Sequence, residues 1–165
     1  MVALLAACAP RERESAPENQ GEAGERREIW AAIQPMAAQR GLDPLFVYAL
    51  VKSESNLDPR AQNGEARGLM QLKPGAWRKV SRLPYETEVW VWRANLEVGM
   101  DSLASMRMAL ARKGVLSFPM LWASYHYGLD FTAEHGFDMS RIPRPSDPIS
   151  YRLWSGDFHP LEPPK

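Results

Sequence analysis

The sequence predicts a single all-α domain of six to seven helices. Apolar residues recur at helical spacing in several segments, and residues that favour helix starts and stops flank them. No alternating stretch is long enough to predict a sheet. A chain of 165 residues is also long enough for one domain to bury a sizeable core.

The ranges of these helices follow from the spacing of apolar residues and from the residues that favour helix starts and stops. They are predicted over residues 29–41, 43–55, 68–72 (closed by Pro74 and Gly75), 77–80, 86–112, 119–125 and 147–154. Asp43 is a favourable N-cap for the second helix, and Pro44 is a favourable first residue. Gly114 follows the long helix as a stop. Asp147 and Gly156 begin and end the last helix in the same way.

Composition excludes some classes of function. The chain carries 20 basic and 20 acidic residues, so no overall positive field would attract nucleic acid. A single Cys excludes an intramolecular disulfide framework. His126, His135 and His159 are scattered without the spacing of metal ligands, so no metal or cofactor is implied.

The amino-terminal segment predicts a membrane anchor. Residues 1–8 are short and apolar, and Leu5-Ala6-Ala7-Cys8 resembles a bacterial lipobox, in which the Cys is lipidated. The alternative is a frayed terminus with one incidental Cys. The lipobox reading places the protein in the bacterial cell envelope, facing the periplasm. Ala9 after Cys8 resembles the outer-membrane sorting pattern.

Three further segments follow the anchor. Residues 9–28 are rich in charge and have only Ala as apolar content, so we expect a disordered tether. The alternative is a solvated surface helix from Glu22 onward. Residues 29–157 form the folded domain, and residues 158–165 form a Pro-rich tail.

Glu54 is the strongest candidate for a catalytic residue. It is expected near the end of the second helix, whose apolar residues predict burial. A carboxyl group in such a poorly solvated place favours its neutral form. A neutral carboxylic acid at physiological pH is what general acid catalysis requires.

Four motifs follow one another over about residues 28–155. They are Glu54-Ser55-Asn56-Leu57-Asp58-Pro59, Ala66-Arg67-Gly68-Leu69-Met70-Gln71-Leu72-Lys73-Pro74, Asn95-Leu96-Glu97-Val98-Gly99 and Ala123-Ser124-Tyr125-His126-Tyr127-Gly128. In this order they resemble the soluble-lytic-transglycosylase (SLT) domain of lytic transglycosylases. The resemblance implies a lysozyme-like fold, no cofactor, peptidoglycan glycan strands as partner and a monomeric protein. It also implies substrate-binding positions at Ser55, Gly68, Leu69, Met70, Gln71, Ala123, Tyr125, His126 and Tyr151.

The resemblance implies cleavage of the bond between N-acetylmuramic acid and N-acetylglucosamine by Glu54 alone. Glu54 would act first as acid and then as base, and the muramoyl 6-hydroxyl would close a 1,6-anhydro ring. Asp58 and Glu65 are nearby in sequence but match no carboxylate of the family, whereas ordinary glycosidases need two. A lysozyme-type muramidase is the alternative enzyme.

The chain departs from the family pattern at two positions near Glu54. His126 stands where the family usually has Asn, and Lys73 stands where many relatives have an apolar residue. An ammonium or imidazolium group beside Glu54 would favour its ionised form and weaken it as an acid. A catalytically weak murein-binding lipoprotein is therefore a third hypothesis.

Overall fold

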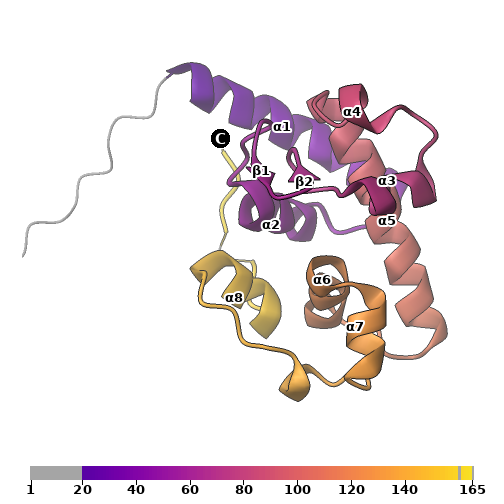
Figure 1. The fold of residues 1–165 in the computed structure, drawn as a ribbon. Helices are drawn as coiled ribbons and strands as arrows, with labels where there is room; N and C mark the ends of the chain where they lie inside the picture. The colour runs from indigo at the N-terminus through magenta and orange to yellow at the C-terminus, as the bar shows by residue number, and fades with distance from the viewer. Residues whose placement is uncertain (1–19, 160, 165) are drawn as a thin grey trace, which may run out of the picture.

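Helix α2 (Pro44–Ser55) lies at the centre of the structure, a computed structural model that describes residues 20–159 and 161–164. Its residues from Phe46 to Val51 are all buried. Helix α1 (Gln20–Gln39) packs on one side of α2, and helix α8 (Pro148–Ser155) packs on another (Figure 1). The predicted mainly α, lysozyme-like fold is confirmed.

Six more helices and one small hairpin surround α2. They are β1 (Gln62–Asn63), β2 (Ala66–Arg67), α3 (Pro74–Val80), α4 (Tyr85–Glu88), α5 (Trp92–Arg112), α6 (Phe118–Tyr127), α7 (Leu129–Glu134) and the 3-10 helix η1 (Met139–Arg141). The two strands pair antiparallel around Gly64, whose φ of 59° suits a tight turn. Helix α6 contacts α5, α7 and α8, so it links the long helix to the lower part of the molecule (Figure 1).

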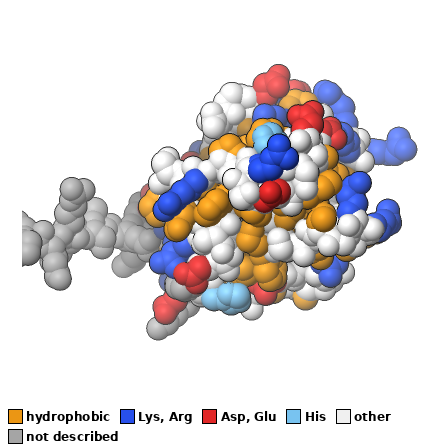
Figure 2. All heavy atoms as spheres, turned by 90° about the horizontal axis from the view of Figure 1, so that it is seen from below, with side chains coloured by type: hydrophobic (Ala, Val, Ile, Leu, Met, Phe, Trp, Pro, Cys, Tyr) orange, Lys and Arg blue, Asp and Glu red, His pale blue; other side chains and the backbone are white. Residues whose placement is uncertain are grey.

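The end of the molecule formed by α6, α7 and α8 has a mixed surface. Figure 2 shows a broken band of hydrophobic side chains across this face, with acidic and basic side chains interspersed around it. This distribution agrees with the zero formal net charge of the chain. Among the described residues, none of the helices combines the length and the apolar character that crossing a bilayer requires.

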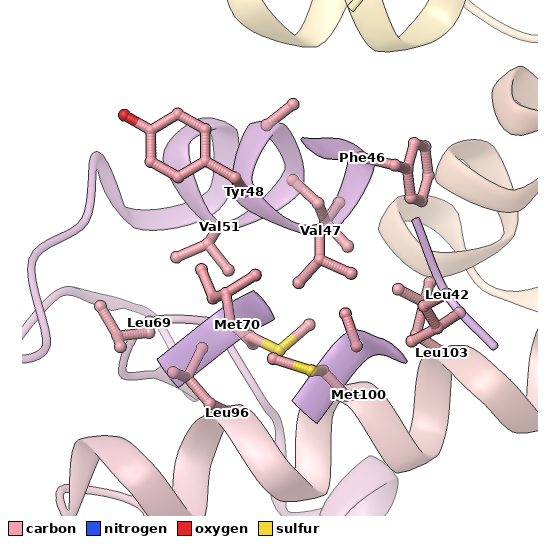
Figure 3. Close-up of a cluster of buried hydrophobic side chains, with 14 of the residues drawn as sticks. Leu42, Phe46, Val47, Tyr48, Val51, Leu69, Met70, Leu96, Met100 and Leu103 are labelled. Carbon is pink, nitrogen blue, oxygen red and sulfur yellow. The ribbon is translucent and has the colours of Figure 1, made fainter. Parts of the chain in front are cut away.

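The main core lies between α2 and α5. Figure 3 shows side chains of α2 facing Met70 and Met100, with the sulfur atoms of the two methionines close together. Met70 and Met100 are fully buried. Gly99 on α5 leaves room for Met70, because a β-carbon at this position would lie 2.8 Å from the Met70 Cβ. Helix α5 therefore approaches the Met70 loop closely because residue 99 has no side chain.

The packed part of the chain is longer at both ends than the sequence predicts. Helix α1 begins at Gln20, so the predicted tether is wrong for residues 20–28, which extend a helix that Ile29 and Ile33 anchor in the core. Residues 22–28 of this extension are exposed or half-buried, and they correspond to the alternative of a solvated helix from Glu22 onward. The predicted tail also differs, because Phe158 is fully buried against other aromatic rings. Cys8 lies outside the described residues.

The predicted helix over residues 86–112 is interrupted. Helices α4 and α5 are separate because Val89 is buried and its carbonyl oxygen accepts a hydrogen bond from the Asn95 side chain at 3.0 Å. The backbone at Val91 is then extended and starts α5.

Two smaller differences concern short helices. Pro74 begins α3 instead of closing the preceding turn, as expected for proline at a first helical position. Helix α7 follows Gly128, whose φ is 101°, and the sequence did not predict this helix. The predicted N-caps of α2 and α8 are confirmed, with Asp43 and Asp147 each accepting backbone N–H bonds.

Substituting Gly99 by Ala tests the close approach of α5 to Met70. The added methyl group overlaps the Met70 side chain, so we expect Gly99→Ala to lower the free energy of unfolding by about 1–3 kcal/mol. Gly24→Ala is the matched control, because Gly24 is also helical and has no atom within 4 Å of the added carbon. The control should be neutral or stabilising by up to about 1 kcal/mol. Urea unfolding of both variants measures the difference, and equal stabilities would contradict this account of the core.

Candidate active site

Glu54 lies on the last turn of α2, where the helix ends abruptly. Asn56 and Leu57 both adopt left-handed backbone conformations, with φ of 53° and 66°, and the N–H of Asn56 still bonds to the Lys52 carbonyl. The Glu54 side chain is 12% exposed. The chain turns away immediately after Glu54, so the carboxyl group is left at the edge of the core with one side open.

Two hollows meet at Glu54. A cleft of ≈ 950 Å³ runs between α3, α5, α6 and α7, and a smaller hollow of ≈ 360 Å³ lies between the end of α2, the hairpin and the start of α8. Ser53, Glu54, Asn63 and Gln71 line both. A chain-like ligand lying through both hollows would therefore pass over the Glu54 carboxyl group.

Asn95 holds the loop that forms one side of the cleft. Its fully buried side chain accepts a hydrogen bond from the Met70 N–H at 2.8 Å and donates to the carbonyls of Arg67 and Val89 at 3.0 Å. Gly68 makes this arrangement possible, because a β-carbon there would lie 2.7 Å from the Asn95 Cγ. Asn95 is therefore the positioning residue of this loop.

Tyr125 connects the same loop to α6. Its hydroxyl donates a hydrogen bond to the Met70 carbonyl at 2.7 Å. Burial raises the pKa of the Tyr125 hydroxyl well above its ordinary value, and the charge of Glu54 raises it further. Tyr125 thus stays protonated and keeps its hydrogen bond, while its oxygen can still accept a bond from a ligand in the cleft.

Gln71 is held by its own loop. Its φ is 45°, and its amide nitrogen donates to the carbonyls of Ala61 and Gly68 at 3.0 and 2.9 Å. Both amide hydrogens are used in these bonds, so the side chain offers a ligand its carbonyl oxygen. Gln71 can therefore accept a hydrogen bond from a hydroxyl or N–H group at the point where the two hollows meet.

His126 contacts Glu54 directly. Its Nδ1 atom lies 3.0 Å from the Glu54 Oε1 atom. This hydrogen bond raises the pKa of His126, partial burial opposes the rise, the Glu54 charge adds to it and the Lys73 charge reduces it. The site therefore pairs a carboxyl group with an imidazole that readily takes up a proton.

A comparison with family models matches residues 31–136 to the Transglycosylase SLT domain. The chain belongs to this family. A search of curated proteins gave no significant match. Membership of the SLT family indicates a lytic-transglycosylase type of activity on peptidoglycan, in the bacterial cell envelope.

The SLT motifs contain residues of two different kinds in this structure. Glu54, Gln71, Tyr125 and His126 line the cleft, whereas several other predicted site residues are structural. Those that lie mainly in the core are Leu69, Met70 and Ala123, each 0% exposed, and Ser55, whose hydroxyl donates to the Val51 carbonyl. Ser55 still lines the smaller hollow, but its side chain bonds to its own helix rather than to Glu54. Gly68 has no side chain and so leaves room for the side chain of Asn95.

Tyr151 is not among the residues that line either hollow beside Glu54. Its ring stacks on Trp154 with centroids 5.7 Å apart, and the Arg144 guanidinium lies 4.4 Å from its centroid. Asp147 and Ile149, near the start of α8, line the smaller hollow instead.

Sequence reasoning did not assign a role in the site to several residues. Asn63, Lys79 and Asp130 line the large cleft, and Asn95 positions the loop. Among these, a signal existed for Asn95, because it is the first residue of the motif Asn95-Leu96-Glu97-Val98-Gly99. Lys73, which the sequence analysis expected near Glu54, lines the same cleft. Within the described residues, no group of three or more His, Cys, Asp or Glu side chains has the arrangement needed to hold a metal ion.

Substituting Asn95 by Ala tests its role as the support of the loop. The Met70 N–H and the Val89 carbonyl lose their partner, while the Arg67 carbonyl keeps its bond from the Leu72 N–H. We expect a loss of about 3 kcal/mol, since each buried unpaired polar group costs about 1–3 kcal/mol. Asn63→Ala removes an exposed amide and should change stability by less than about 0.5 kcal/mol. Thermal and urea unfolding measure both, and an Asn95→Ala protein as stable as the control would refute the role.

Proposed function

We propose that this SLT protein cleaves the β-1,4 bond between N-acetylmuramic acid and N-acetylglucosamine and forms a 1,6-anhydromuramoyl product. The observation that carries the proposal is the position of Glu54, a largely buried carboxyl group where two hollows join. A glycan strand that fills both hollows has sugars on each side of the carboxyl group. The bond between those sugars is then the one that Glu54 can reach.

Glu54 acts first as an acid and then as a base. Its carboxyl proton passes to the glycosidic oxygen as the bond to the muramoyl C1 breaks, and the N-acetylglucosamine hydroxyl leaves. The substrate's own acetamido group stabilises the positive charge at C1. The ionised Glu54 then removes the proton of the muramoyl 6-hydroxyl, whose oxygen bonds to C1 and closes the ring. One proton leaves Glu54 and one returns, so the enzyme is regenerated.

The arrangement of carboxyl groups favours a mechanism with one carboxylate. Asp58 and Glu65 line neither hollow. Asp147 lines the smaller hollow, but its carboxylate accepts the Ser150 N–H bond at 2.7 Å as the cap of α8. Asp130 on α7 lines the large cleft and is the one observation that favours the second candidate, a muramidase that uses water.

Mass spectrometry of products from purified sacculi separates these reactions. The anhydro product is lighter than the hydrolysis product by one molecule of water, and we expect the anhydro form. Products with reducing ends would instead support the muramidase. Binding to sacculi without release of fragments would support a murein-binding protein.

Glu54→Gln tests the assignment of the catalytic acid. The amide is close in shape but gives up no acidic proton, so we expect fragment release to fall by at least about 100-fold, as for loss of a general acid. Binding to sacculi should be retained. Glu65→Gln is the matched control, because Glu65 is exposed and lies outside both hollows. Activity of Glu54→Gln within tenfold of the native protein would contradict the assignment.

We further propose that a lipid on Cys8 holds the domain at the outer membrane, facing the periplasm. Leu5-Ala6-Ala7-Cys8 supports this proposal, and the charged residues that follow separate the anchor from α1. Several acyl chains give firm attachment, whereas one gives only reversible binding.

In the bacterium, Cys8→Ser should move the protein from the membrane fraction to the soluble periplasmic fraction, because no acyl chain can be attached. Fractionation and intact mass of the native protein measure this, with the Glu54→Gln protein as a control that keeps Cys8. A Ser variant that stays with the membrane, or a native protein without lipid, would refute the anchor.

A further inference from the structure

The contact between His126 and Glu54 joins the catalytic acid to a second titratable group. The Nδ1–Oε1 distance is 3.0 Å, and the Glu54 side chain is 12% exposed while that of His126 is 39% exposed. Water therefore has limited access to Glu54 but reaches the imidazole. A proton that enters the site from solvent can be held first by His126.

Neighbouring rings fix the orientation of the imidazole. His126 stacks on the buried ring of Trp122, with centroids 5.3 Å apart and planes at 13°, and meets the edge of Tyr127 at 4.7 Å. This packing holds Nδ1 toward Glu54 and restricts other ring positions. His126 also lies in the last turn of α6, where the helix dipole favours a positive charge.

We infer that His126 is a positioning residue that shares a single proton with Glu54 and thereby sets the pH range in which Glu54 is a usable acid. This inference rests on the proposed function of Glu54. In the form that holds one proton, that proton resides on His126 Nδ1 or on the Glu54 carboxyl group. Transfer from Nδ1 to the carboxylate gives a neutral imidazole and a neutral acid, and this form protonates the glycosidic oxygen.

The sharing of one proton changes the pH dependence of catalysis. Above the pKa of His126 the pair holds no proton, so activity falls as pH rises. Below it, the pair holds one proton that is divided between the two groups in a constant ratio, so activity becomes independent of pH. Without His126 there is no shared proton and no such plateau, so activity should continue to rise as pH falls through this range.

Other charged and titratable groups face the pair from the surrounding elements. Those that line the large cleft are Lys73 and Lys79 at α3, Tyr125 and Tyr127 on α6 and Asp130 on α7, and those in the smaller hollow are Lys52 and Asp147. Lys73 acts on His126 most directly among the cations, because its charge lowers the pKa of His126. Glu54 and Lys73 thus shift the proton affinity of His126 in opposite directions.

Rates measured against pH on soluble uncrosslinked peptidoglycan strands test the shared proton. For the native protein, kcat/KM should level off as pH falls below the pKa of His126, while for His126→Asn it should continue to rise. In this range, the ratio of the kcat/KM of His126→Asn to that of the native protein should increase by about tenfold for each unit that the pH falls, which is the slope for one proton. Above this range the two should differ by less than about tenfold, because Asn keeps one hydrogen bond worth about 1 kcal/mol.

His135→Asn is the matched control for the removal of a histidine. The Nδ1 of His135 lies 2.8 Å from the Phe131 carbonyl oxygen, and His135 is not among the residues that line either hollow. The control should keep the native pH profile. Superimposable profiles of the native and His126→Asn proteins would overturn the inference.

NMR titration of the His126 imidazole provides a readout that does not need activity. Glu54→Gln removes the charge that His126 faces, so its titration midpoint should move to lower pH. Lys73→Met removes an opposing charge, so the midpoint should move to higher pH, together with the break in kcat/KM. An unchanged midpoint in Glu54→Gln would refute the pairing. The native protein could lack activity while its His126 midpoint still moves to lower pH in Glu54→Gln. That result would support the pairing and refute only the proposed function.

Discussion

The buried side chain of Asn95 is the constraint on which the cleft depends. Its amide binds three backbone groups, on Arg67, Val89 and Met70, that are separated by up to 28 residues from it. These bonds stop α4 from continuing into α5 and hold the loop before α3 against the start of α5. A fully satisfied buried amide is directional, so it fixes the loop in one arrangement where apolar contacts alone would allow several.

The backbone of Met70 extends this constraint to the site. Its N–H bonds to Asn95 on α5, and its carbonyl accepts the Tyr125 hydroxyl from α6. His126 lies one helical turn after Trp122 on the same helix, α6, and its imidazole contacts Glu54. The three walls of the cleft are thus connected through the backbone of one residue, Met70. The loop beside Glu54 is held in one arrangement because the side chains of Asn95 and Tyr125 bond to its backbone.

The polar character of the site reflects a balance between the needs of the proposed acid, Glu54, and those of a cleft open to the proposed glycan strand. Glu54 is mostly shielded, yet it faces two hollows through which a strand can run. A carboxylate in such a place needs a partner when ionised, and His126 supplies one. Lys73 limits how strongly His126 holds its proton. In the inferred proton sharing, His126 and Lys73 therefore act on the same proton.

The sequence by itself determined the helical class, the ends of α2 and α8 and the family motifs, because Asp43 and Gly156 act on neighbours a few residues away. Only the tertiary structure decided the break before α5, the added helix α7 and the pairing of Glu54 with His126, 72 residues apart. These features depend on bonds between distant segments, and local propensity carries no information about which distant partner will be present.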